Sequence, residues 1–166
     1  MTKRLTTTQI VYTALLIALN VTIARIFLIP VPMTRGNINL CDAGIIIAAL
    51  LYGRKQGAIV GALSGLLLDL ISGYAQYMFF SLIVHGLEGF IAGWLSEKHT
   101  RQARFVGMGI GVIVMVAGYL LADSILYHFS TGILGVPMNL IQGIVGSAVA
   151  YPIFLSIRKY APNFSH

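Results

Sequence analysis

The chain has 166 residues, of which 57% are hydrophobic and 10% are charged, and its mean hydropathy is +0.85. This composition excludes an ordinary soluble domain and predicts an all-α integral membrane protein, because long apolar runs without period-two alternation favour helices over barrel strands. The formal charge of +6 is interpreted as a topology signal and an attraction to anionic lipid, so no nucleic acid partner is expected.

Six transmembrane helices are expected in a single domain of residues 1–166. The first is expected to remain as a span, because its apolar stretch is longer than that of a signal peptide and lacks a convincing cleavage site. The second is the shortest, since "AGIIIAALLYG" falls below the roughly 20 residues that a spanning helix prefers. The predicted spans are residues 8–29, 38–53, 55–73, 76–95, 105–127 and 135–157.

The positions of the cationic residues predict the orientation of these helices. Nine of the eleven Lys and Arg residues fall in alternate connections, and such a bias marks the cytoplasmic side. We therefore expect both termini in the cytoplasm. The nine residues are Lys3, Arg4, Arg54, Lys55, Lys98, Arg101, Arg104, Arg158 and Lys159.

Small residues at four-residue spacing predict close helix packing. In "GAIVGALSG" they are Gly57, Gly61 and Gly65, for which packing within the bundle is expected. Ala14 and Ala18 in "YTALLIALN" lie on the cytoplasmic half of the first span. Spacing alone favours packing within the chain for this pair, with docking of a second membrane subunit as the alternative.

Most polar side chains of the predicted spans lie in the outer half of the membrane, and the cytoplasmic halves hold small and aliphatic residues. A channel or a proton relay would continue its polar lining across the bilayer. We therefore expect a cup that opens outward and is sealed below. The candidate ligand-binding residues are Arg35, Asn39, Asp42, Tyr74, Tyr77, His85, Glu88, Asp123, Asn139 and Gln142.

His85 and Glu88 lie near the middle of the fourth span, in "SLIVHGLEGFIAG". A buried ionisable group costs several kcal/mol unless it has a partner. Since a helix turns by about 100° per residue, the two side chains lie about 60° apart and should face a cavity or each other. Glu88 is our hypothesis for the floor of a ligand pocket, and the alternative is a structural pair that holds helices in register.

The other candidates have similar alternatives. Asp123 either lies near the headgroups as an interface carboxylate or binds ligand. Asn139 and Gln142, one turn apart, either join helices or read the edge of a heterocycle. Tyr74 and Tyr77 belong to an interfacial belt or stack on a flat ligand. We expect structural anchoring from Asp69, and snorkelling or solvation for Arg25 and Arg35.

The sequence gives little support for catalysis, so no catalytic residue, metal or cofactor is expected. His85 and Glu88 offer two metal ligands, and the cytoplasmic His99 and His166 are too far away to supply a third. Ser81 lies one turn from His85, but no nucleophile elbow accompanies it. "GRKQGA" lacks the Walker pattern, so ATP hydrolysis would need another chain.

Nearly the whole chain resembles the S components of energy-coupling factor (ECF) vitamin transporters. The segments that carry the resemblance are "LTTTQIVYTALLIALN" and "NINLCDAGIIIAALLYGRKQGAIVGALSGLLLDLISGYAQYMFFSLIVHGLEGFIAGWLSEK". The likeness is greatest to the branch for riboflavin-like and hydroxymethylpyrimidine substrates. It implies a six-helix subunit in a prokaryotic plasma membrane that captures a vitamin or its precursor from outside.

The resemblance also implies partners and a pocket. S components associate with a transmembrane T component and two ATP-binding-cassette (ABC) ATPases. The family's small-residue motif, which meets the T component, matches Ala14 and Ala18 and so raises docking above internal packing. The family's pocket is formed by the first outer loop and spans four to six, and it maps onto the residues from Arg35 to Asp42 and onto His85, Glu88, Asp123, Asn139 and Gln142.

Charge narrows the expected cargo. The proposed cup holds more carboxylates than cations, which disfavours a strongly anionic vitamin. We expect hydroxymethylpyrimidine, the thiamine precursor, or pyridoxine, with riboflavin as a further possibility. In this hypothesis Glu88 accepts a hydrogen bond from the ring or its substituents, His85 supplements it and Asn139 reads another edge. The rival functions are a proton-coupled secondary transporter, which would need no ATPase, and a membrane-embedded enzyme.

Overall fold

The computed structural model describes residues 7–30 and 37–160. Six helices account for most of these residues, as the sequence predicts, and two short strands were not expected. The elements are α1 (Thr7–Ile26), β1 (Ile29–Pro30), β2 (Asn37–Ile38), α2 (Cys41–Tyr52), α3 (Arg54–Ser72), α4 (Met78–Ser96), α5 (Arg101–Leu126) and α6 (Phe129–Tyr160).

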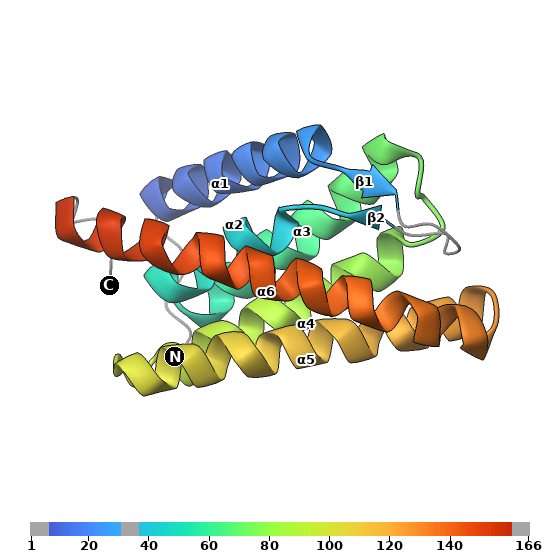
Figure 1. The fold of residues 1–166 in the computed structure, drawn as a ribbon. Coiled ribbons are helices and arrows are strands. Elements are labelled where there is room, and N and C mark those ends of the chain that lie inside the picture. Colours follow the sequence, from blue (N-terminus) through green and yellow to red (C-terminus); the bar gives the residue numbers. More distant parts are fainter. Residues whose placement is uncertain (1–6, 31–36, 161–166) are drawn as a thin grey trace, which may run out of the picture.

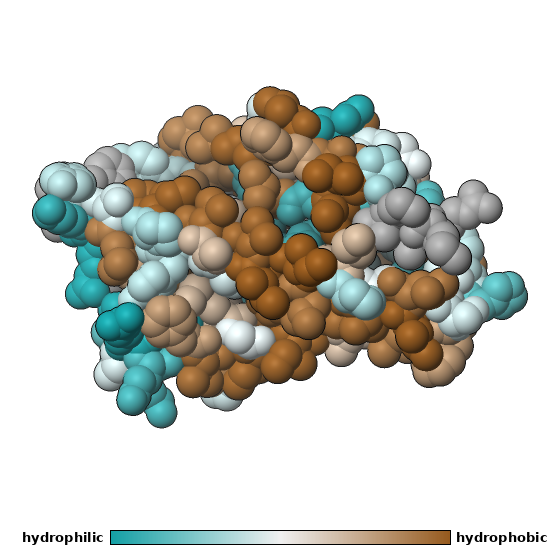
Figure 2. Space-filling model, in the orientation of Figure 1, coloured by the Kyte–Doolittle hydropathy of each residue, from teal (hydrophilic) through white to brown (hydrophobic). Residues whose placement is uncertain are grey.

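Five of these helices are long and apolar enough to cross a membrane, and α2, with 12 residues, is shorter. In Figure 1, α1 begins and α6 ends at the same end of the bundle. Figure 2 shows hydrophobic residues over the middle of one face and hydrophilic residues at its two ends. This distribution is that of a protein whose middle lies in lipid and whose ends meet water. The chain is a multi-pass membrane protein.

The helix α2 is surrounded by other helices, because it packs against α1, α3, α4 and α6. Its central residues Ile45 and Ala48 are fully buried, which explains the near-continuous apolar run of this segment. The observed start of this helix lies three residues after the predicted start at residue 38. Asn37 and Ile38 pair instead with Pro30 and Ile29 in a two-stranded antiparallel sheet, and the helix begins at Cys41.

The last helix is longer than predicted, since it starts at Phe129 and not at residue 135. Gly132, Gly135 and Pro137 in its first turns disfavour a helix in isolation. Gly132 instead allows close contact with α5, because a Cβ atom there would lie 2.6 Å from the carbonyl oxygen of Leu120. Tertiary packing therefore overrides local propensity at this end.

Close packing between α3 and α4 confirms the interpretation of the glycine spacing. A Cβ atom at Gly61 would collide with the carbonyl oxygen of His85, and one at Gly89 would collide with that of Gly57. Near-contact of two backbones requires residues without side chains. The contact also fixes the position of His85 relative to α3.

One end of the bundle has an apolar core. Fully or nearly fully buried side chains of α2, α5 and α6 meet there, and Arg104 stacks on Phe154 at 5.1 Å from the ring centroid. The predicted orientation places this core on the cytoplasmic side. Its buried members are Ile46, Leu50, Leu51, Met108, Ala150 and Phe154, and we call it the sealed end.

Candidate functional site

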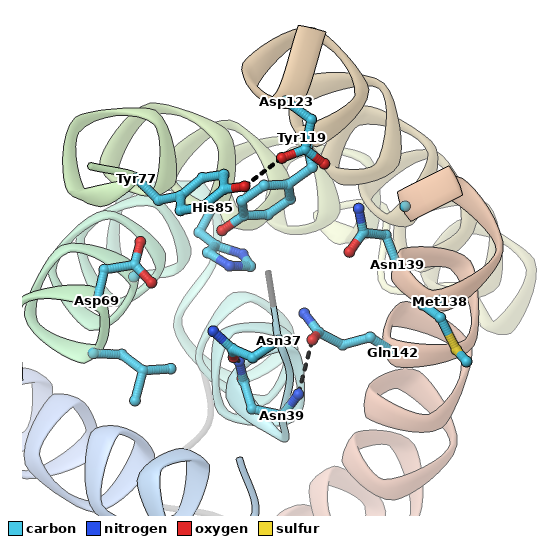
Figure 3. Close-up of a pocket in the computed structure, with 13 residues that line it drawn as sticks. Asn37, Asn39, Asp69, Tyr77, His85, Tyr119, Asp123, Met138, Asn139 and Gln142 are labelled. Carbon is cyan, nitrogen blue, oxygen red and sulfur yellow. Dashed lines mark hydrogen bonds between the residues drawn. The ribbon is translucent and has the colours of Figure 1, made fainter. Parts of the chain in front are cut away.

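A cavity lies between α3, α4, α5 and α6, beside β2 and near the end of the bundle opposite the sealed end. The empty space measures about 570 Å³ with its open mouth included. Figure 3 shows polar side chains from several elements that converge on this space. Its lining residues are Asn37, Asn39, Gly65, Leu68, Asp69, Tyr77, His85, Tyr119, Asp123, Gly135, Met138, Asn139 and Gln142.

Two tyrosines form an aromatic wall of the cavity. The hydroxyl of Tyr77 donates a hydrogen bond of 2.5 Å to Asp123 Oδ1, and the hydroxyl of Tyr119 shares one of 2.7 Å with Ser81 Oγ. The two rings are 6.5 Å apart, and the Tyr119 ring meets the imidazole of His85 edge-on at 5.5 Å. These bonds hold both rings in place, so the wall is formed before a ligand arrives.

Amide side chains form another wall. The backbone N–H of Asn39 donates to Gln142 Oε1 at 2.8 Å, which links the start of α2 to α6 (Figure 3). The side chain of Asn39 donates to Asn37 Oδ1 and accepts a bond from the backbone N–H of Cys41, so it also supports the first turn of α2. Asn139 is half-buried and points into the cavity. Amides offer both donors and acceptors to a bound ring.

His85 lies at the inner boundary of the cavity and has two carboxylates behind it. Its Nδ1 atom is 2.8 Å from Glu88 Oε2 and 3.4 Å from Asp42 Oδ1. Glu88 and Asp42 are fully buried and do not line the cavity. Glu88 is therefore not the exposed floor that we expected, because the imidazole separates it from the open space. A role for these carboxylates in binding stays a prediction, and the structure places them where they would act through His85.

The expectation that His85 and Glu88 lack a third metal ligand is wrong. Asp42 joins them, and one ligand atom from each residue lies within 4.8 Å of the others. The third ligand is a carboxylate and not one of the histidines His99 and His166. It reaches His85 because the first turn of α2 lies against the middle of α4.

Several other predicted residues lie away from the cavity lining. Tyr74 is half-buried in the turn between α3 and α4 and does not line the cavity. Arg35 lies outside the described residues. Asp69, for which anchoring was expected, both accepts a hydrogen bond from the backbone N–H of Tyr74 through its carbonyl and lines the cavity.

The sequence-based prediction missed Met138 and did not list Tyr119 as a site residue, and it included Asn37 only within the segment from Arg35 to Asp42. Tyr119 lies one turn before Asp123, so the helical period already placed it on the same face. No feature of the sequence marked Met138 as a site residue, because methionine is common in apolar helices. Asn37 is brought to the cavity by the strand pairing, which the sequence analysis did not foresee.

Ala14 and Ala18 are exposed on the outer side of α1. The side of this helix that packs against the bundle carries Thr13, Ile17 and Val21 instead. Packing within the chain, which spacing alone favoured, is therefore wrong for this pair. The exposed pair leaves docking of a partner as the remaining prediction.

Comparison with known proteins identifies the family. The family model described as "ECF-type riboflavin transporter, S component" matches residues 4–159. The chain is 38% identical over 134 residues to the "Thiamine precursor transporter HmpT" of Lactococcus lactis subsp. cremoris, a match that covers 80% of this chain and 77% of that protein.

Two solved structures share the fold. The S component of a bacterial ECF transporter has a TM-score of 0.67 at 22% identity, and covers 94% of this chain and 98% of its own. The S component for biotin from an ECF-type ABC transporter has a TM-score of 0.66 at 19% identity, with 98% and 100% covered. The chain therefore belongs to the S components of ECF-type transporters, a family of membrane transport subunits and not of enzymes.

Proposed function

We propose that this chain captures a thiamine precursor, hydroxymethylpyrimidine, for an ATP-driven ECF importer. The observation that carries the proposal is the cavity itself, which presents amides and an imidazole beside a tyrosine wall. A relative at 38% identity whose name states a thiamine precursor supports this cargo. Pyridoxine is the competing small ring, and riboflavin is the cargo named by the matching family.

A small flat heterocycle suits the geometry of the lining. The faces of Tyr77 and Tyr119 offer apolar contact to a ring, while Asn139 and Gln142 offer hydrogen bonds to its edge. His85 would contact the ring with the edge of its imidazole that faces the cavity. Glu88 would hold the opposite edge through its 2.8 Å contact with Nδ1, and so set which nitrogen carries a proton toward the ligand.

The charges around the cavity favour a neutral or protonatable cargo. Asp69 and Asp123 line it, and Asp42 and Glu88 lie directly behind His85. These carboxylates would repel a phosphorylated vitamin. An aminopyrimidine has donors for them and carries no negative charge. Arg35 and Tyr74 remain proposed ligand contacts.

The partners belong to the proposal as well. Transport would need a T component and two ABC ATPases, since the family works in ECF-type transporters and the chain has no Walker pattern. The exposed pair Ala14 and Ala18 would let a helix of the T component approach α1 closely.

Calorimetric titration of the purified chain in detergent tests the cargo. The ligands are hydroxymethylpyrimidine, pyridoxine, thiamine and riboflavin, each without partner subunits. We expect roughly one-to-one binding of hydroxymethylpyrimidine with a Kd on the order of micromolar or better. Tighter binding of one of the other three ligands would identify that ligand as the cargo instead of hydroxymethylpyrimidine. No binding, together with uptake driven by a pH gradient in vesicles that hold the chain alone, would support a secondary transporter.

A further inference from the structure

With both carboxyl groups ionised, the cluster of Asp42, His85 and Glu88 would carry more negative charge than its surroundings offset. Both carboxylates are fully buried and His85 is 3% exposed. Within residues 7–30 and 37–160, the ion pairs to Asp42 and Glu88 come from His85 and not from a Lys or Arg. A protonated imidazole would still leave one negative charge in a medium of low dielectric, which is costly.

Several oxygens of the cluster also lack hydrogen-bond partners. Both carboxylate oxygens of Asp42 and Oε1 of Glu88 are buried without one. Buried carboxylate oxygens are ordinarily paired. Dense packing keeps this arrangement in place, because α6 lies against Asp42 at Gly146 and α3 lies against α4 at Gly61. These oxygens require either protons held on the two carboxyl groups or a positive partner between them.

We propose that Asp42, His85 and Glu88 bind a divalent metal ion of the Zn²⁺ class beneath the cavity. The three ligand atoms lie within 4.8 Å of one another, and Nδ1 of His85 is 2.8 and 3.4 Å from the two carboxylate oxygens. Tetrahedral ligand atoms about 2.0–2.2 Å from a Zn²⁺ ion are separated by roughly 3.3–3.6 Å, so small side-chain shifts suffice.

The charge balance of the cluster favours a divalent cation. Two carboxylates, a neutral imidazole and a divalent cation sum to zero, whereas a monovalent cation would leave one negative charge. One imidazole and two carboxylates also form a mixed nitrogen and oxygen donor set that suits Zn²⁺, Mn²⁺ or Fe²⁺ better than Ca²⁺. The ion would tie the first turn of α2 to the middle of α4 and would turn the remaining nitrogen of His85 toward the cavity.

The test uses the full chain without an affinity tag, purified in detergent and stripped with a chelator. The protein is dialysed against Zn²⁺ alone, and bound metal per chain is measured by mass spectrometry. We expect about one ion per chain, and an affinity more than about tenfold lower in Glu88→Gln and Asp42→Asn, because even second-shell changes weaken metal sites 10–100-fold. Asp69→Asn removes a nearby buried carboxylate outside the cluster and should keep the ion.

X-ray absorption of the loaded wild-type chain supplies a readout that does not depend on variants that fold poorly. One imidazole with two or three oxygen ligands supports the site. Less than a tenth of an ion per chain, several histidine ligands, or full metal binding in both cluster variants would overturn it, and would leave shared protons as the neutralising charge. Retained Zn²⁺ with no vitamin binding would contradict the proposed cargo and not the metal site.

Discussion

The helix α2 has two ends with opposite chemistry. Its first turn carries Asp42, fully buried beside His85 and the cavity, and its last turn places Leu50 and Leu51 in the sealed end. The same 12-residue helix therefore takes part in both regions. The difference indicates a division of labour, in which polar side chains at one end recognise a ligand and apolar packing at the other blocks a continuous path.

Removal of a large side chain from the sealed end should have the largest effect. Phe154 is 1% exposed, and Phe154→Ala should lower the free energy of unfolding by about 3–5 kcal/mol. Ligand affinity of the protein that remains folded should stay within about twofold, since the cavity is at the other end. Denaturant titration in detergent measures the first effect and calorimetry the second.

Phe79, which is 65% exposed, is the matched control. Phe79→Ala should leave both quantities unchanged. A loss of affinity in Phe154→Ala as large as its loss of stability would show that the two ends do not act separately.

In contrast to Phe154→Ala, the substitution Glu88→Gln should act mainly on ligand affinity. The substitution keeps the volume but removes the carboxyl group behind His85, so hydroxymethylpyrimidine affinity should fall about 10–100-fold, or roughly 1.4–2.8 kcal/mol. Chelator-stripped protein is used so that metal does not contribute. Glu97→Gln removes an exposed carboxylate from the other end and should bind as wild type does. Unchanged affinity in Glu88→Gln would remove this residue from recognition.

Tyr77→Phe tests whether the aromatic wall depends on its hydrogen bond. Loss of the hydroxyl that donates to Asp123 should lower stability by about 1 kcal/mol, because water at the open mouth can replace the donor. Affinity should fall several-fold as Asp123 becomes free to turn. Thermal unfolding and calorimetry report the two effects, and a change of more than tenfold in affinity would assign the hydroxyl itself to the ligand.

Substitutions on the outer side of α1 should have the smallest effect on the isolated chain. Leucine at both Ala14 and Ala18 should leave stability and ligand binding unchanged, because these positions are exposed. Copurification with a T component should be lost. Gly109→Leu, at a position where an added Cβ atom meets open space, controls for a bulkier outer surface. Normal complex formation by the α1 variant would exclude this face as the docking surface.

The helices could be predicted from the sequence, because long apolar runs and glycine spacing depend on near neighbours along the chain. The start of α2 could not, since it depends on the pairing of Ile29 with Ile38 across a loop. The early start of α6 could not either. It depends on contact between Gly132 and α5, which offsets the poor helix propensity of this stretch.

The site was predicted in part. His85, Asn39, Asn139, Gln142, Tyr77 and Asp123 line one cavity, as the depth of polar residues suggested. The layering of His85 in front of Glu88 and Asp42 was not predictable, because it requires the relative rotation of α2 and α4. The same limitation explains the missed third metal ligand.

The most direct test of the account is a crystal structure of the purified chain with hydroxymethylpyrimidine. We expect ring density in the cavity, against Tyr119 and within hydrogen-bond distance of His85 and Gln142, with no change in the sealed end. Ligand density outside this cavity, for example in the apolar groove between α5 and α6 beside Val112 and Ile144, would contradict the assignment of the polar end as the capture site.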